Sequence, residues 1–101
     1  MANEAKVLKQ TLEVLKKHDR VYAIRMANAA TGIPDIIACI GGRFVGIEVK
    51  DDVGGTYTLT EAQKVRAKQI LQSGGDFWIV DNHNVDYLND TIDSYLERST
   101  V

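Results

Sequence analysis

Three ionisable residues interrupt the most apolar part of the chain. Asp35 precedes the apolar run at residues 36–40, and Glu48 and Lys50 lie two residues apart near the end of the next apolar run. Residues two apart in a strand project from the same face of a sheet. Burying a charge without a partner costs several kcal/mol, against a whole-domain stability of about 5–15 kcal/mol. These side chains therefore need either one another or a ligand.

A divalent cation is one ligand that would account for them. Mg²⁺ prefers carboxylate oxygens, backbone carbonyls and water. Asp35 and Glu48 can supply two oxygens, and the backbone carbonyl of Val49 can supply a third. Lys50 beside the cation can orient an attacking water, lower its pKa or neutralise charge on a phosphate. The alternative is a structural ion pair of Lys50 with Glu48 or Asp35, and the three residues alone do not decide between them.

Apolar periodicity and turn residues predict seven elements in the order α-β-β-β-α-β-α. The strands are expected at residues 21–28, 35–40, 43–50 and 77–80, with Gly41-Gly42 as a hairpin turn. The helices are expected at about residues 4–18, 60–73 and 85–96. This order predicts an α/β fold, a mixed sheet flanked by helices, within one domain over residues 1–101.

Polar residues at the expected helix ends support these bounds. Asn3 can cap the first helix, and Thr60 and Gln63 have the spacing of a capping box. Residues 51–58 are expected to form a mobile loop, because they contain Gly54-Gly55. Helical spacing predicts the buried face of the first helix, namely Ala5, Leu8, Leu12 and Leu15.

The charge distribution limits where a nucleic acid can bind. The net charge of −2 argues mildly against nucleic-acid binding, because phosphate contacts need Lys and Arg. However, residues 1–50 carry eight Lys/Arg against five Asp/Glu, whereas residues 51–101 carry four against nine. A basic face must come from the first half and from Lys64, Arg66 and Lys68. Residues 76–97 hold six acids and no Lys or Arg, so this stretch should face away from DNA.

Other features exclude several classes of protein. A single cysteine, Cys39, excludes an intrachain disulfide, and its apolar surroundings predict a buried small hydrophobe. The polar N-terminus is unlike a signal peptide, and no apolar stretch approaches the ~20 residues that span a bilayer. We therefore expect an intracellular, cytoplasmic protein without a membrane partner. His18 and His83 are expected at the surface, and Trp78 in the core.

The ordered set of motifs resembles the PD-(D/E)XK nuclease superfamily, and most closely its VRR-NUC (virus-type replication-repair nuclease) branch. Gly32-Ile33-Pro34-Asp35 is followed, thirteen positions after the Asp, by Glu48-Val49-Lys50, and Thr60-Glu61-Ala62-Gln63 resembles the Thr- or Ser-led helix that carries a Gln. Glu4 and Arg25 match a Glu in the first helix and an Arg late in the first strand. The resemblance covers residues 4 to about 88. It implies a restriction-endonuclease-like mixed sheet of about four strands flanked by helices.

The resemblance also implies roles for the matched residues. Asp35 and Glu48 resemble the metal ligands, and Lys50 the catalytic lysine. Gln63 resembles a Gln at the rim of the active site, although a capping role alone is the alternative. Glu4 resembles an extra acid that binds the metal or orients its water, whereas a first-turn acid favoured by the helix dipole is the alternative. Glu13 is a weaker candidate for the same role.

Candidate DNA contacts are less distinctive. They are Lys6, Arg25, Lys64 and Lys68, and solvated helix or strand faces are the alternative interpretation. The implied activity is Mg²⁺- or Mn²⁺-dependent endonucleolytic cleavage of DNA. The expected substrate is a four-way (Holliday) junction, and flap or duplex DNA is the alternative. The resemblance also allows a phage or a virus as the source of the protein.

Stand-alone members of the superfamily include dimeric junction resolvases, so a homodimer acting on structured DNA is expected. The apolar stripes of the first and last helices and the outer strand at residues 21–28 are the faces expected to be available for dimerisation. Two other classes stay open, namely a non-catalytic nucleic-acid-binding module with the same fold and an interaction protein that uses its acidic C-terminal helix.

Overall fold

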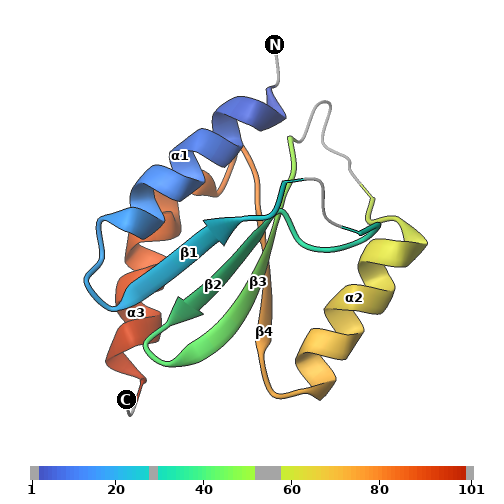
Figure 1. The fold of residues 1–101 in the computed structure, drawn as a ribbon. Coiled ribbons are helices and arrows are strands. Elements are labelled where there is room, and N and C mark those ends of the chain that lie inside the picture. The colour runs from blue at the N-terminus through green and yellow to red at the C-terminus, as the bar shows by residue number, and fades with distance from the viewer. Residues whose placement is uncertain (1–2, 28–29, 52–57, 100–101) are drawn as a thin grey trace.

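The computed structural model describes residues 3–27, 30–51 and 58–99. It contains a four-stranded sheet in the order β1-β2-β3-β4, with α1 and α3 on one face and α2 on the other (Figure 1). The strands are β1 (Val21–Arg25), β2 (Ile36–Ile40), β3 (Arg43–Val49) and β4 (Asp76–Val80). The helices are α1 (Glu4–Lys16), α2 (Glu61–Gln72) and α3 (Leu88–Glu97), and the 3-10 turn η1 (Val85–Tyr87) precedes α3. The expected element order and mixed α/β architecture are confirmed.

The connections between strands follow from local sequence. β1, β2 and β3 pair antiparallel, and β3 pairs parallel with β4 across the α2 crossover. Gly41 and Gly42 close the β2–β3 hairpin with φ of 59° and 85°. Two consecutive positive φ values are what a tight two-residue hairpin turn needs, and glycine adopts them without a steric cost. The expected hairpin turn is confirmed.

The hydrophobic core lies between the sheet and the pair α1 and α3. Alternate residues of β2 and β3 point into it, because successive side chains of a strand face opposite sides. The apolar sides of α1 and α3 cover these residues. The fully buried side chains that form the centre of this layer are Leu15, Ile36, Ile40, Ile47, Ile92, Val45 and Val49.

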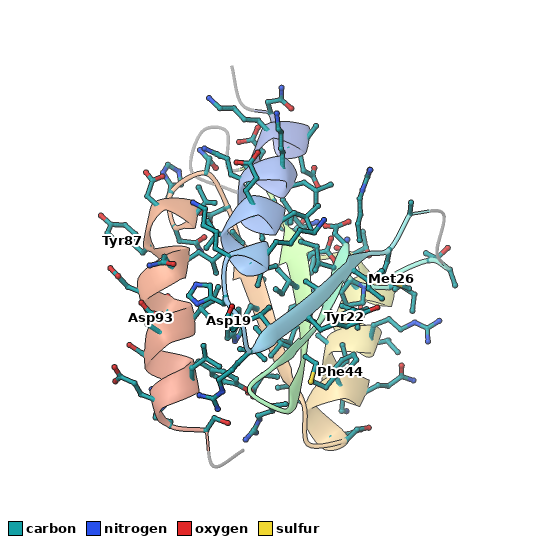
Figure 2. The ribbon with its side chains drawn as sticks, turned by 60° about the vertical axis from the view of Figure 1, so that its left-hand side comes forward. Asp19, Tyr22, Met26, Phe44, Tyr87 and Asp93 are labelled. Atoms are coloured by element: carbon teal, nitrogen blue, oxygen red, sulfur yellow. The ribbon has the colours of Figure 1, made fainter. Side chains whose placement is uncertain are left out.

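The opposite face of the sheet is covered only in part. α2 packs on β3 and β4, and the rest of this face carries exposed apolar side chains, among them Tyr22 of β1 at 69% and Phe44, near the start of β3, at 44% exposure. Cys39 lies on this face and is exposed, so the expectation that it is buried is wrong. Its neighbours in sequence are buried because they point to the other face of β2. Figure 2 shows Tyr22, Met26 and Phe44 on the near side of the molecule.

Several expected details of the helices and strands are corrected. β1 ends at Arg25, three residues before the expected end. Ala5 is exposed and Thr11 is buried, where its hydroxyl donates to the Val7 carbonyl at 2.7 Å. His18 is not a surface residue, because its side chain is 13% exposed and its Nε2 lies 2.9 Å from the Asn89 side-chain oxygen.

The apolar stripes of α1 and α3 do not form a free surface. Both helices direct these residues into the core, so the expectation that the stripes are available for dimerisation is wrong. The expected mobile loop at residues 51–58 lies largely outside the described residues. No helix in the described ranges has the length and apolar character needed to cross a membrane.

Candidate active site

Asp35 and the end of β3 meet at one edge of the sheet, next to the first turn of α2. The backbone carbonyl of Asp35 accepts from the Met26 N–H at 2.8 Å, which continues the β1–β2 ladder by one pair. The side chain of Asp35 accepts from the Val49 N–H at 2.8 Å. Asp35 is thereby held against the segment that carries Glu48 and Lys50. Figure 1 shows the N-terminal ends of α1 and α2 at this same end of the sheet.

Glu48 is a buried carboxyl group with little to stabilise its charge. It is 3% exposed, and its Oε2 has no hydrogen-bond partner among the described residues. Burial raises its pKa to about 8, and the hydrogen bond to Asp35 and the negative charge of Asp35 act in the same direction. The positive charge of Lys50 lowers this pKa, and the negative charge of Glu4 raises it. A second positive charge would be needed to keep Glu48 ionised at neutral pH.

These residues fit a hard divalent cation. The unpartnered Glu48 oxygen and the Asp35 carboxylate are donors that Mg²⁺ and Mn²⁺ accept. Within an extended strand, the N–H and C=O of one residue point to the same side. Because the Val49 N–H points to Asp35, the Val49 carbonyl also points towards β2. Two carboxylates and one carbonyl therefore lie at the same end of the sheet.

Lys50 is positioned from α2 as well as from β3. Its backbone N–H donates to the Val80 carbonyl at 2.9 Å, and its Nζ donates to Gln63 Oε1 at 3.2 Å. The same Gln63 oxygen accepts from the Thr60 N–H at 2.9 Å, while the Thr60 hydroxyl accepts from the Gln63 N–H at 3.1 Å. The expected capping box is confirmed. Gln63 therefore both starts α2 and holds the ammonium group of Lys50.

The segment before Asp35 fixes α2 against the site. Gly32 has φ of +83°, and a Cβ at this position would meet the Ala62 carbonyl carbon and oxygen at 2.6 Å. Pro34 is buried, and a Cβ at Gly46 of β3 would meet Pro34 at 3.0 Å and Ile70 of α2 at 2.8 Å. Because Ala62 immediately precedes Gln63, this close packing sets the distance between the Asp35 segment and the residue that holds Lys50.

The structure leaves the expected fourth acid at the margin. Glu4 is exposed in the first turn of α1, and its charge reaches Glu48, but no group of three or more acidic, His or Cys side chains in the described chain is placed to hold a metal. Glu13 lies elsewhere, in a groove that α1 forms with η1 and α3. The structure thus brings together Asp35, Glu48, Lys50 and Gln63, and does not bring Glu4 or Glu13 into the cluster.

The candidate DNA contacts are exposed but do not form one cluster. Lys6 lies on α1, Arg25 lies at the end of β1, and the two lysines of α2 are Lys64 and Lys68. Lys64 forms an exposed ion pair with Glu61 at 3.3 Å. The acids of α3 lie on the sheet face opposite α2 (Figure 1), whereas Asp81 follows Val80 at the same end of the sheet as Lys50.

Asp51 is a residue at this end of the sheet that sequence reasoning missed. It directly follows Lys50, and its Oδ1 is buried without a hydrogen-bond partner in the described part of the chain. The sequence signal that could have identified Asp51 is its position directly after the Glu-x-Lys strand. With Asp35 and Glu48, Asp51 is a third acid at this end of the sheet.

Comparisons with known proteins identify the fold. No family model matches the sequence, and no curated protein matches it. A solved structure named "VRR_NUC domain protein" has a TM-score of 0.68 at 23% identity, over 94% of this chain and 88% of that chain. A second, named "VRR_NUC domain", has a TM-score of 0.65 at 18% identity, over 94% of this chain and 95% of that chain.

The four-stranded mixed sheet with its flanking helices is a restriction-endonuclease-like α/β fold. Within that class, the chain has the fold of the VRR-NUC domains, and it has this fold along almost its whole length. The resemblance inferred from the sequence motifs is confirmed at the level of the fold.

Proposed function

We propose that residues 1–101 form one VRR-NUC-like domain that hydrolyses phosphodiester bonds in DNA with Mg²⁺ or Mn²⁺. The observation that carries this proposal is the unpartnered buried oxygen of Glu48, which lies with Asp35 beside Lys50. A protein that needed these residues only for an ion pair would pair that oxygen, because an unsatisfied buried acceptor is destabilising. The VRR-NUC fold of the chain supports the same interpretation.

Asp35, Glu48 and the Val49 carbonyl would hold the divalent cation, with Glu4 within electrostatic reach of Glu48. When bound, the cation would supply Lewis acidity and lower the pKa of the attacking water. The Lys50 ammonium group would stabilise the negative charge that develops on the phosphate in the transition state. Gln63 would hold Lys50 in place through its 3.2 Å hydrogen bond. Lys6, Arg25, Lys64 and Lys68 are proposed as contacts to the DNA backbone.

The proposed substrate is structured DNA, and a four-way junction is the form that we favour. This preference is supported by the resemblance to stand-alone junction resolvases, which act as homodimers. A homodimer would present two equivalent sites to the two strands that must be cut. Flap and duplex DNA are the alternative substrates.

Nicking of supercoiled plasmid tests the activity directly. The protein should nick the plasmid with Mg²⁺ or Mn²⁺ and should not do so in EDTA. A panel of junction, flap, bubble and duplex DNA then ranks the substrates. If the protein binds these DNAs but cleaves none of them with either Mg²⁺ or Mn²⁺, the result would instead favour a non-catalytic nucleic-acid-binding module.

A further inference from the structure

The outer edge of β1 has free hydrogen-bonding groups. The pairs Arg20–Gly41 and Met26–Asp35 are hydrogen-bonded across β1 and β2, with distances of 2.9 and 2.8 Å. Hydrogen-bonded and non-bonded pairs alternate along an antiparallel ladder, so the even-numbered residues of β1 bond to β2. The odd-numbered residues therefore direct their N–H and C=O groups outwards, where the described residues contain no further strand. Among these outward groups, the Val21 N–H donates to the His18 carbonyl at 3.3 Å.

This edge lacks the devices that commonly protect an edge strand. β1 contains no proline and is paired without a bulge, and its one charged residue, Arg25, is the last of the strand. Tyr22 and Ile24 are 69% and 45% exposed, and Met26 beyond them is 38% exposed. Natural monomers usually cover such an edge or place charges along it. Figure 2 shows β1 on the near side of the molecule, with Tyr22 and Met26 beside it.

We propose that the outer edge of β1 pairs antiparallel with β1 of a second copy of this chain, about a two-fold axis at Ala23. Ala23 is the middle residue of the five, so this register is the one that pairs the whole strand. Ala23 would form a hydrogen-bonded pair with Ala23 of the partner subunit, and Val21 would lie opposite Arg25 of the partner subunit. The outward Ala23 and Arg25 N–H groups and the Ala23 and Val21 carbonyls would all be satisfied.

The side chains of the exposed face favour a copy of this chain as the occupant. In this register Tyr22 lies opposite Ile24 of the partner subunit, as a close non-hydrogen-bonded pair of an aromatic and a β-branched residue, which is a favourable combination. The row Phe44, Cys39 and Tyr22 would continue into Ile24, Ile37 and Gly46 of the partner subunit. A two-fold axis perpendicular to the sheet keeps both exposed faces on one side. Two rows of uncharged side chains would then each run without interruption across six strands, namely β1, β2 and β3 of both subunits.

The size of the contact predicts a reversible dimer. A five-residue edge and its flanking side chains bury less than the roughly 1,600 Å² of a standard stable interface. Association should therefore depend on protein concentration in the micromolar range. With strands about 4.8 Å apart and a rise of about 3.4 Å per residue, the two Asp35 residues would lie about 25 Å apart on the same face. This last consequence rests on the proposed function, whereas the interface itself does not.

Sedimentation equilibrium over a concentration series tests the interface without reference to cleavage. Wild-type protein should dimerise, and Ala23→Pro should be monomeric with an unchanged circular dichroism spectrum, because the N–H that is lost faces outwards. Phe44→Lys should still dimerise, since Phe44 lies two strands from the edge. A monomeric wild type, a dimeric Ala23→Pro, or loss of the dimer only in Phe44→Lys would overturn the proposal.

Disulfide trapping tests the register and covers the case in which Ala23→Pro fails to fold. In a Cys39→Ser background, Tyr22→Cys with Ile24→Cys should give a covalent dimer on mild oxidation. Non-hydrogen-bonded partners have Cα atoms about 4.5 Å apart, within the disulfide range. Tyr22→Cys alone should not cross-link, because the two copies of this position would be separated by about 8 Å, beyond that range. Equal cross-linking of the single and double variants, or none in either, would overturn this register.

Discussion

The backbone N–H of Val49 donates a hydrogen bond of 2.8 Å to the side chain of Asp35. This bond ties the segment before β2 to the residue between Glu48 and Lys50. It also uses one carboxylate oxygen of Asp35. One backbone contact thus places two acids and a lysine at the same end of the sheet, and each of them can be varied separately.

Replacement of Lys50 tests its proposed role in the transition state. Lys50→Ala should lower the cleavage rate by about 10²–10³-fold at saturating Mg²⁺, the usual effect of losing one positioned electrostatic group. DNA binding, measured by fluorescence anisotropy with Ca²⁺, should be nearly unchanged. Lys16→Ala is the matched control, because it removes the same charge from an exposed position in the last turn of α1 that is not among the proposed DNA contacts. A wild-type rate in Lys50→Ala would remove this mechanism.

Asp35→Asn separates a metal ligand from a structural ion pair. The Asn side-chain oxygen can still accept from the Val49 N–H, and at a pH above about 8, where Glu48 is ionised as well, the repulsion between the two neighbouring carboxylates is lost. At such a pH the melting temperature in EDTA should therefore be equal to or higher than that of the wild type. The increase in melting temperature that Mg²⁺ or Mn²⁺ gives the wild type should disappear, since this increase reflects binding to the folded state. A clear decrease in EDTA would favour the ion pair.

The raised pKa of Glu48 predicts how metal-free stability depends on pH. In the unfolded chain Glu48 ionises near its ordinary value of 4.5, whereas in the folded protein it ionises near 8. Its contribution to stability is therefore complete below pH 4.5 and is lost as the pH rises towards 8, by up to about 1.4 kcal/mol per pH unit.

Glu48→Gln supplies the reference for this measurement, because it leaves the other titrating groups in place. The difference in unfolding free energy between the two proteins in EDTA should shift steadily against the wild type from pH 4.5 to 8. Urea unfolding at several pH values measures it. A difference that stays constant over this range would show that Glu48 is already ionised in the folded state.

The elements of the fold could be predicted from the sequence because each has a local signal. Asn3 and the Thr60–Gln63 capping box mark two helix starts, and Gly41-Gly42 marks the hairpin. The proximity of Asp35 to Glu48 could also be anticipated, because a tight hairpin pairs strands whose residues are close in sequence.

Features that depend on coverage of the sheet could not be predicted. The exposure of Cys39 arises because α2 packs on β3 and β4 and leaves the same face of β2 open. An apolar run such as residues 36–40 does not reveal which of its two faces is covered. The contact of Lys50 with Gln63 joins two elements across a loop, and no local pattern encodes the distance that Gly32 sets against Ala62.

Gln63 has two functions that substitutions can separate. Gln63→Glu retains a capping-box residue at the same helix position, so α2 should start normally and stability should change little. It introduces a negative charge beside the Lys50 ammonium group, which should offset part of the positive charge offered to the phosphate and lower the cleavage rate. Gln63→Ala should lower both stability, by about 1 kcal/mol, and the cleavage rate. A wild-type cleavage rate in Gln63→Glu would limit Gln63 to capping.

Gly32 and Gly74 form a matched pair that isolates the packing of α2 against the site. Both have positive φ, at +83° and +90°, so alanine at either position should cost about 1–2 kcal/mol of backbone strain. A Cβ at Gly74 would meet nothing within 4 Å, whereas a Cβ at Gly32 would meet the Ala62 backbone at 2.6 Å. Urea unfolding should therefore show a clearly larger loss in Gly32→Ala than in Gly74→Ala.

The same pair should differ in activity. In Gly32→Ala the first turn of α2 must shift away from the Asp35 segment, and Gln63, the residue after Ala62, must move with it. Lys50 would then lose its 3.2 Å contact, so cleavage should decrease even at temperatures where the variant is fully folded. Gly74→Ala changes the opposite end of α2 and should cleave at the wild-type rate. Equal stability and equal cleavage in the two variants would contradict the role assigned to the close approach of Gly32 and Ala62.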